Sequence, residues 1–172
     1  SESNPIVPYA EYDSRSVLGL AAYIVLHTRP DCAYSTAVCA RFSGCRNTEN
    51  VVKAINHLAW YLIDTEEDHV LTFWKTEENS GLNAFSDASF ANCPITRKSH
   101  YGYFLRYGEN IFGWRSKLQS IPALSSRDSE LIASVECIKH LLGERFFLCE
   151  TGVLPGGATT VRLDTKASLE GR

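Results

Sequence analysis

The sequence predicts an α/β protein in which a small, mainly helical segment (1–76) precedes a mixed sheet with one long helix (81–172). In the first half, apolar residues recur at steps of three and four, which is typical of amphipathic helices. In the second half, short β-rich runs come before one long helical pattern and one last β-rich run. A polar stretch, Lys75 to Gly81, separates the two patterns. The order of three strands, a helix and a strand indicates a layered α/β fold.

Three helices are expected in the first half. The first covers Ser16 to Leu26, and the second covers Asp31 to Phe42 after the break at Pro30. The third follows Thr48, a good N-cap residue. Its buried stripe is predicted to consist of Val51, Val52, Ile55, Leu58, Ala59 and Leu62. The β-rich run Val70 to Trp74 predicts a short strand.

Four strands and a helix are expected in the second half. A capping-box pattern, Ser125 followed three residues later by Asp128, marks the start of the helix. The strands are expected at Leu82–Ser86, Tyr101–Arg106, Asn110–Trp114 and Thr159–Leu163, with a turn at 107–110. The predicted buried stripe of the helix is Leu131, Ile132, Val135, Ile138, Leu141 and Leu142.

Composition excludes several classes of protein. The apolar and charged fractions are those of an ordinary globular chain, and no apolar run approaches the ~20 residues that span a bilayer. The polar start does not read as a signal peptide, and the lack of Met suggests a piece of a longer protein. Residues 1–80 carry 6 basic and 11 acidic side chains (−5), and residues 81–172 carry 11 and 9 (+2). A polyanion should therefore bind the second half.

Six cysteines are spread along the chain without a C-x-x-C pair, which favours free thiols in a reducing compartment. The alternative is a metal site, for example Cys137 with His140 one helical turn later. Three tryptophans, Trp60, Trp74 and Trp114, are interpreted as core residues, with a base-stacking platform as the alternative.

Three acidic residues are candidates for a metal site. Asp87 is expected directly after the first strand, Glu130 in the first turn of the long helix and Asp164 at the end of the last strand. If the first and last strands are neighbours, all three meet at one sheet edge. Clustered carboxylates repel one another unless a cation such as Mg²⁺ binds between them. Taken singly, each could be a turn former or a partner of the helix dipole.

The second half closely resembles the ribonuclease H domain of copia-type retrotransposon polyproteins. The matching motifs are F-S-D-A-S-F-A, R-K-S-x-x-G-Y, W-x-S-K-x-Q and A-L-S-S-x-x-x-E, found at 85–91, 97–103, 114–119 and 123–130. V-R-L-D-T-K-A-S at 161–168 resembles the third acidic motif of the family. The first half, including T-R-P-D-C-A-Y-S-T-A-V-C-A-R-F-S, resembles the thumb-like end of the upstream reverse transcriptase.

The resemblance implies hydrolysis of the RNA strand of an RNA–DNA hybrid with two Mg²⁺ or Mn²⁺ ions. It implies that Asp87 bridges both metals and that Glu130 and Asp164 complete the second site. Ser126 and Arg127 would contact the hybrid, whose recognition depends on shape and 2′-hydroxyl groups. Candidate phosphate contacts, each with solvated surface charge as the alternative, are Arg97, Lys98, Arg115 and Lys117. The implied location is a cytoplasmic virus-like particle, with the nucleus as an alternative.

Two departures from the family pattern define the alternatives. The paired Asp motif of the polymerase is absent, so this chain is not expected to polymerise DNA. The family's fourth acidic residue lies beyond Arg172, which leaves the first metal site incomplete. The alternative function is a captured, catalytically weak or inactive fragment that serves as a binding or structural module. A third idea, that residues 1–75 hold the hybrid, fits poorly with their negative charge.

Overall fold

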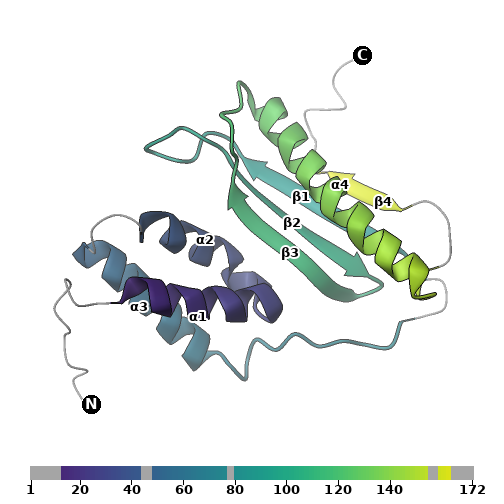
Figure 1. Cartoon of the computed structure of the whole chain (residues 1–172), viewed down its shortest axis with the longest axis horizontal. Coiled ribbons are helices and arrows are strands. Elements are labelled where there is room, and N and C mark those ends of the chain that lie inside the picture. Colours follow the sequence, from purple (N-terminus) through teal and green to yellow (C-terminus); the bar gives the residue numbers. More distant parts are fainter. Residues whose placement is uncertain (1–12, 44–47, 77–79, 155–158, 164–172) are drawn as a thin grey trace. The chain divides into compact units, whose positions relative to one another are not determined.

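The computed structural model describes residues 13–43, 48–76, 80–154 and 159–163. Internal contacts divide the chain between Leu71 and Thr72 into a helical unit and a sheet unit. The helical unit contains α1 (Ser14–His27), the 3-10 helix η1 (Pro30–Cys32), α2 (Ala33–Phe42) and α3 (Glu49–Asp64) (Figure 1). The predicted α/β class, with helices before a mixed sheet, is confirmed.

The three helices of the helical unit pack around one small core. Asp13 caps α1 by accepting a hydrogen bond from the Ser16 backbone N–H. The second helix differs from its prediction, because the first turn after Pro30 is a 3-10 turn and not α-helix. Thr48 does hold the N-cap position of α3, although its side chain makes no capping hydrogen bond. The core residues are Leu18, Ala21, Val25, Cys32, Cys39, Ile55, Leu58 and Leu62.

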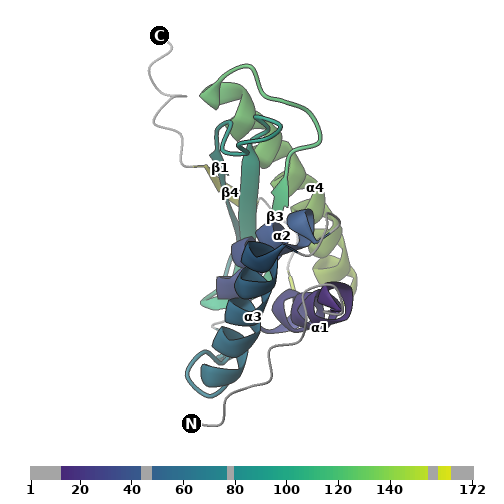
Figure 2. The ribbon, with the colours of Figure 1, turned by 90° about the vertical axis from the view of Figure 1, so that its left-hand side faces the viewer.

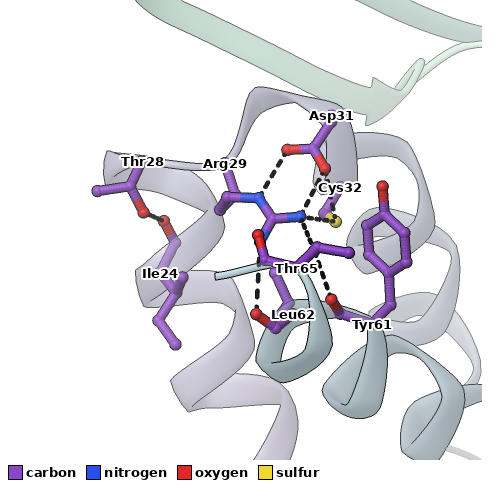
Figure 3. Close-up of polar contacts among 8 residues, drawn as sticks. All are labelled: Ile24, Thr28, Arg29, Asp31, Cys32, Tyr61, Leu62 and Thr65. Atoms are coloured by element: carbon purple, nitrogen blue, oxygen red, sulfur yellow. Dashed lines mark hydrogen bonds and ion pairs between the residues drawn. The ribbon is translucent and has the colours of Figure 1, made fainter. Parts of the chain in front are cut away.

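A buried arginine joins the segment after α1 to the end of α3 (Figure 3). Arg29 is 4% exposed and forms two hydrogen bonds with Asp31, Nε to Oδ1 at 3.0 Å and Nη2 to Oδ2 at 2.8 Å. The same Nη2 donates to Thr65 Oγ1 at 2.8 Å, just after α3. The guanidinium also lies 5.4 Å from the centre of the Tyr61 ring. Hydrogen bonding from Arg29 lowers the pKa of Asp31, so the pair stays ionised.

The sheet has the strand order β3-β2-β1-β4. Its strands are β1 (Leu82–Ser89), β2 (His100–Tyr107), β3 (Asn110–Leu118) and β4 (Thr160–Leu163). The first three form an antiparallel meander, as the sequence predicted, and the last strand lies beside the first, where it was expected; the structure shows that β4 pairs parallel to β1. Helix α4 (Ser126–Glu150) connects β3 to β4 and packs on one face of this sheet (Figure 2).

Helix α4 begins as predicted but buries a different face. The Ser125 side chain accepts a hydrogen bond from the Asp128 backbone N–H at 3.1 Å, which confirms the capping pattern. The buried residues are mostly small: Ser129, Ala133, Ser134, Cys137 and Leu141. Of the predicted stripe only Leu141 is buried, because small side chains let the helix backbone approach the sheet closely. No helix of the described residues is long and apolar enough to cross a membrane.

The predicted strand at Val70–Trp74 is wrong. This segment has no strand partner; instead, the side-chain amide of Asn110 pairs with the backbone of Trp74, accepting from its N–H at 2.6 Å and donating to its C=O at 2.8 Å. Trp74 is 68% exposed and Trp60 is 51% exposed, so only Trp114 is a core tryptophan. β-propensity alone does not form a strand when the segment makes no backbone ladder with a neighbouring strand.

The described cysteines are free thiols, as expected: Cys32, Cys39, Cys93 and Cys137 are buried, and Cys149 is half-buried. Burial raises the pKa of Cys32 and of Cys137 from 9.0 to about 11. Cys45 lies outside the described residues.

We expect both high-pKa thiols to react slowly with iodoacetamide at neutral to mildly basic pH. Only the thiolate reacts, and a rise in pKa of about two units lowers its fraction by roughly 100-fold. Mass spectrometry of alkylated peptides, from the native and the urea-unfolded protein, measures this for Cys32 and Cys137. The half-buried Cys149 is the internal comparison and should react sooner in the native protein. Equal native and unfolded rates for Cys137 would contradict the expectation.

Candidate functional site

Asp87 lies within β1 and not after it, because this strand continues to Ser89. Its position in the strand places it on the face opposite to α4, since Ala84 is packed in the core below the helix and neighbouring side chains alternate. Its cross-strand partner on β2 is Gly102, which has no side chain to cover the carboxylate. Asp87 is accordingly exposed and accessible to ions and to a polyanion.

Glu130 is half-buried on α4, near the same end of the sheet. Helix α4 runs antiparallel to β1, since Cys137 Sγ is 4.0 Å from the carbonyl oxygen of Phe85, while Tyr107 Oη at the other end donates to the Val153 carbonyl. From Cys137 back to Glu130 the helix rises ~10 Å. From Phe85 forward to Asp87 the strand rises ~7 Å. Helix α4 begins at the C-terminal end of β1 (Figure 1), and both acidic residues therefore lie towards that end.

A buried glutamine fastens the start of α4 to this end of the sheet. Gln119 directly follows β3 and is 1% exposed. Its Nε2 donates to the carbonyl oxygen of Ser129 at 2.8 Å, and its backbone N–H donates to the carbonyl of Ser99 at 2.8 Å. Because Ser129 is next to Glu130, Gln119 positions the acidic residue. Sequence reasoning included this glutamine in a motif but gave it no role.

We expect Gln119→Leu to lower the free energy of unfolding by about 2 kcal/mol, because the buried carbonyl of Ser129 loses its side-chain donor. Urea unfolding of the full chain, followed by far-UV circular dichroism, measures the change. Ser120→Ala is the matched control, since Ser120 is the exposed neighbour. Identical unfolding curves for Gln119→Leu and the unmodified protein would exclude the anchoring role.

The predicted nucleic-acid-binding residues have different surroundings. Ser126 and Arg127 are exposed in the first turn of α4, close to Glu130 in the helix. Arg97 is exposed in the loop between β1 and β2, and it has a positive φ of 54°. Lys98 in the same loop is half-buried, with its ammonium donating to the carbonyl of Ser120, so this lysine joins two loops.

The other two basic candidates lie on the edge strand β3. Arg115 and Lys117 are both exposed and pair in register with Tyr103 and Tyr101. Those tyrosines belong to the core beneath α4, and cross-strand partners point to the same face of a sheet. The two basic side chains are therefore on the face that carries α4, but the helix does not cover them, since both are exposed.

The third acidic residue, Asp164, lies outside the described residues. The neighbouring part of β4 is described, and its parallel register pairs Leu163 with Ser86. In the sequence Asp164 directly follows Leu163, and Asp87 directly follows Ser86. Within the described residues no three His, Cys, Asp or Glu side chains form a metal-binding group, and that set does not include Asp164.

Comparison with known proteins identifies the relatives of this chain. It is 33% identical over 147 residues, 86% of its length, to the retrovirus-related Pol polyprotein from transposon TNT 1-94 of Nicotiana tabacum. It is 31% identical over 136 residues to the secreted RxLR effector protein 161 of Plasmopara viticola, 89% of which is covered. It is also 30% identical over 133 residues to the mitochondrial protein AtMg00810 of Arabidopsis thaliana, 53% of which is covered. The chain therefore belongs to one family with the Plasmopara effector, and its homologues include retrotransposon Pol polyproteins.

The shared region is a small part of the longest relatives. This Pol relative spans 10% of the tobacco polyprotein and 8% of a second Pol polyprotein, from transposon RE1 of Arabidopsis thaliana. No protein-family model matches the chain. The comparisons thus show homology to a part of retrotransposon Pol polyproteins, whereas the assignment to one enzymatic part of such a polyprotein is a proposal that depends on the geometry of the site.

Proposed function

We propose that this Pol relative is the ribonuclease H portion of a copia-type polyprotein, preceded by the end of its reverse transcriptase. Its proposed reaction is metal-dependent hydrolysis of the RNA strand of an RNA–DNA hybrid during reverse transcription. One observation carries the proposal: the parallel register of β1 and β4 pairs the two residues, Ser86 and Leu163, that directly precede Asp87 and Asp164. Glu130, held by Gln119, lies towards the same end of the sheet, but α4 covers the opposite face from Asp87, so in this proposal Glu130 reaches the ion past the end of β1.

The donor groups fit a divalent cation of the magnesium type. Mg²⁺ prefers hard oxygen ligands, is bound through one or two carboxylates and keeps several water molecules. Asp87 is exposed, as such an ion requires, and no cross-strand side chain from β2 covers it. In this proposal Asp87, Glu130 and Asp164 hold Mg²⁺ or Mn²⁺, with the family's fourth acid required for a complete two-ion site.

Bound ions would supply an activated water molecule and stabilise the leaving oxygen of the phosphodiester. The residues of the chain would then have three tasks. The acidic residues would bind and orient the metal ions. Gln119 would keep the first turns of α4 in place, and the basic residues would attract the hybrid. Arg97, Arg115, Lys117 and Arg127 are exposed and suited to phosphate contacts, and Lys98 is the weakest candidate because its ammonium is already bonded.

The test is cleavage of a hybrid whose RNA strand is labelled. The chain should bind an RNA–DNA hybrid more tightly than double-stranded DNA of the same sequence, and it should cut only the RNA. Cleavage should require Mg²⁺ or Mn²⁺ and stop in EDTA. It should become faster when the chain continues through the family's fourth acidic residue. Absence of metal-dependent cleavage in that longer protein would end the catalytic proposal.

One observation favours a second function. The Plasmopara relative, 89% of which this chain covers, is named as a secreted effector and not as a polymerase. A chain of this kind could work outside a polyprotein, as a captured binding or structural module. In that case the chain would unfold at the same temperature with and without Mg²⁺ and would not bind hybrid. A ribonuclease H would be stabilised by Mg²⁺, because binding to the folded state raises its stability.

A further inference from the structure

The outer face of α4 carries an apolar stripe that no other described residue of the sheet unit covers. Its members are between 37% and 66% exposed, whereas the inner face of the helix is packed on the sheet (Figure 2). At 100° per residue they fall within one sector of the helix, on the side away from Cys137. The α4 stripe consists of Leu131, Val135, Ile138, Leu142 and Phe146.

We propose that the α4 stripe is the interface of a homodimer in which the α4 helices of two chains pack antiparallel around a twofold axis. Steps of four, three, four and four residues separate its members. The first three steps follow the alternation of four and three that forms the seam by which two helices pack side by side, and the last step is four instead of three. A twofold interface brings the same surface of both chains together, so the stripe must be complementary to itself when reversed.

The order of the side chains meets this requirement. With the twofold axis between Ile138 and Lys139, Leu131 of one chain faces Phe146 of its partner. In the same register Val135 faces Leu142, and Ile138 lies next to its own copy at the centre. The pairing thus matches the apolar positions of the stripe along its whole length. A parallel pair would place every exposed charge beside its own copy, whereas in the antiparallel pair this holds for Lys139 beside the axis.

Charges at the two ends fit the same register. Arg127 comes four residues before Leu131, and Glu150 comes four residues after Phe146. In the antiparallel pair Arg127 of each chain therefore faces Glu150 of its partner, and both side chains are exposed and free to reach each other. The interface thus has an apolar centre and an oppositely charged pair at each end, the usual anatomy of a specific contact.

The area is that of a weak dimer. Five partly exposed apolar side chains, at roughly 100 Å² each, bury about 500 Å² per chain and about 1,000 Å² in total. This is the lower limit for a specific interface, so we expect a dissociation constant on the order of 10 µM. The inference does not depend on nuclease activity.

Sedimentation equilibrium of the full chain, from about 1 to about 100 µM, tests the proposal. We expect a monomer–dimer equilibrium that Leu142→Lys weakens at least tenfold, because a lysine would be buried opposite Val135. Ile121→Lys is the matched control, since Ile121 is outside α4 and, like Leu142, is 59% exposed. A chain that stays monomeric throughout, or a dimer that both variants weaken equally, overturns the proposal.

A charge exchange tests the antiparallel register. Arg127→Glu and Glu150→Arg should each weaken the dimer by about threefold, and the double variant should restore it. Neither change harms the helix, because an acid near its start and a base near its end suit the helix dipole. Circular dichroism checks that all variants stay folded. Failure of the double variant to recover would exclude this pairing.

Discussion

Asp87→Asn should reduce metal-dependent cleavage of an RNA–DNA hybrid by about 1,000-fold, at the upper end of losses seen when a charge-stabilising group is removed. An amide keeps the size of the side chain but lacks the negative charge that holds a divalent ion. Because Asp87 is exposed on β1, the substitution should leave the fold intact. Single-turnover cleavage in Mg²⁺, by the chain continued through the family's fourth acid, measures the effect.

Asp128→Asn is the control for Asp87→Asn. Asp128 is in the first turn of α4 and carries the same charge, but it is not one of the three candidate ligands. Its substitution should change cleavage by less than about threefold. Asp87→Asn should also bind the hybrid at least as tightly as the unmodified chain, because one repulsive charge is lost. A similar loss of activity in both variants would mean that bulk charge, and not a metal site at Asp87, determines the rate.

Arg29→Ala should lower the free energy of unfolding of the helical unit by about 3 kcal/mol. Removing one partner of a buried ion pair leaves the other without compensation, and here several hydrogen bonds are lost as well. Those bonds connect the segment after α1 to the end of α3 (Figure 3). Hydrogen exchange followed by mass spectrometry should show faster exchange in α1 and α3 while β1 to β3 stay protected.

Arg29→Lys and Arg15→Ala complete this experiment. A lysine keeps the positive charge but cannot make the two parallel hydrogen bonds to Asp31, so its loss of stability should lie between those of the other variants. Arg15 is exposed in α1, and its removal should change stability by less than about 0.5 kcal/mol. If Arg29→Ala leaves exchange in α3 unchanged, the arginine does not join the segment after α1 to the end of α3.

The proposed site could be predicted from the sequence only in part. Motif spacing identified Asp87 and Glu130, and the structure places both towards one end of the sheet. The sequence did not predict that Asp87 lies inside β1. The polar residues after Phe85 resemble a turn, but in the structure they continue the antiparallel pairing with β2. The role of Gln119 depends on a contact with Ser129, ten residues later, which no periodicity reveals.

The sequence by itself determined the order of the elements, the capped start of α4 and the division into a helical and a sheet half. Helix periodicity, caps and strand alternation are local, so they can be read from neighbouring residues. Only the tertiary structure decided which face of α4 is buried and that Val70 to Trp74 forms no strand. Both depend on which surfaces are available for packing: small residues let α4 approach the sheet closely, and its larger apolar residues remain on the outside.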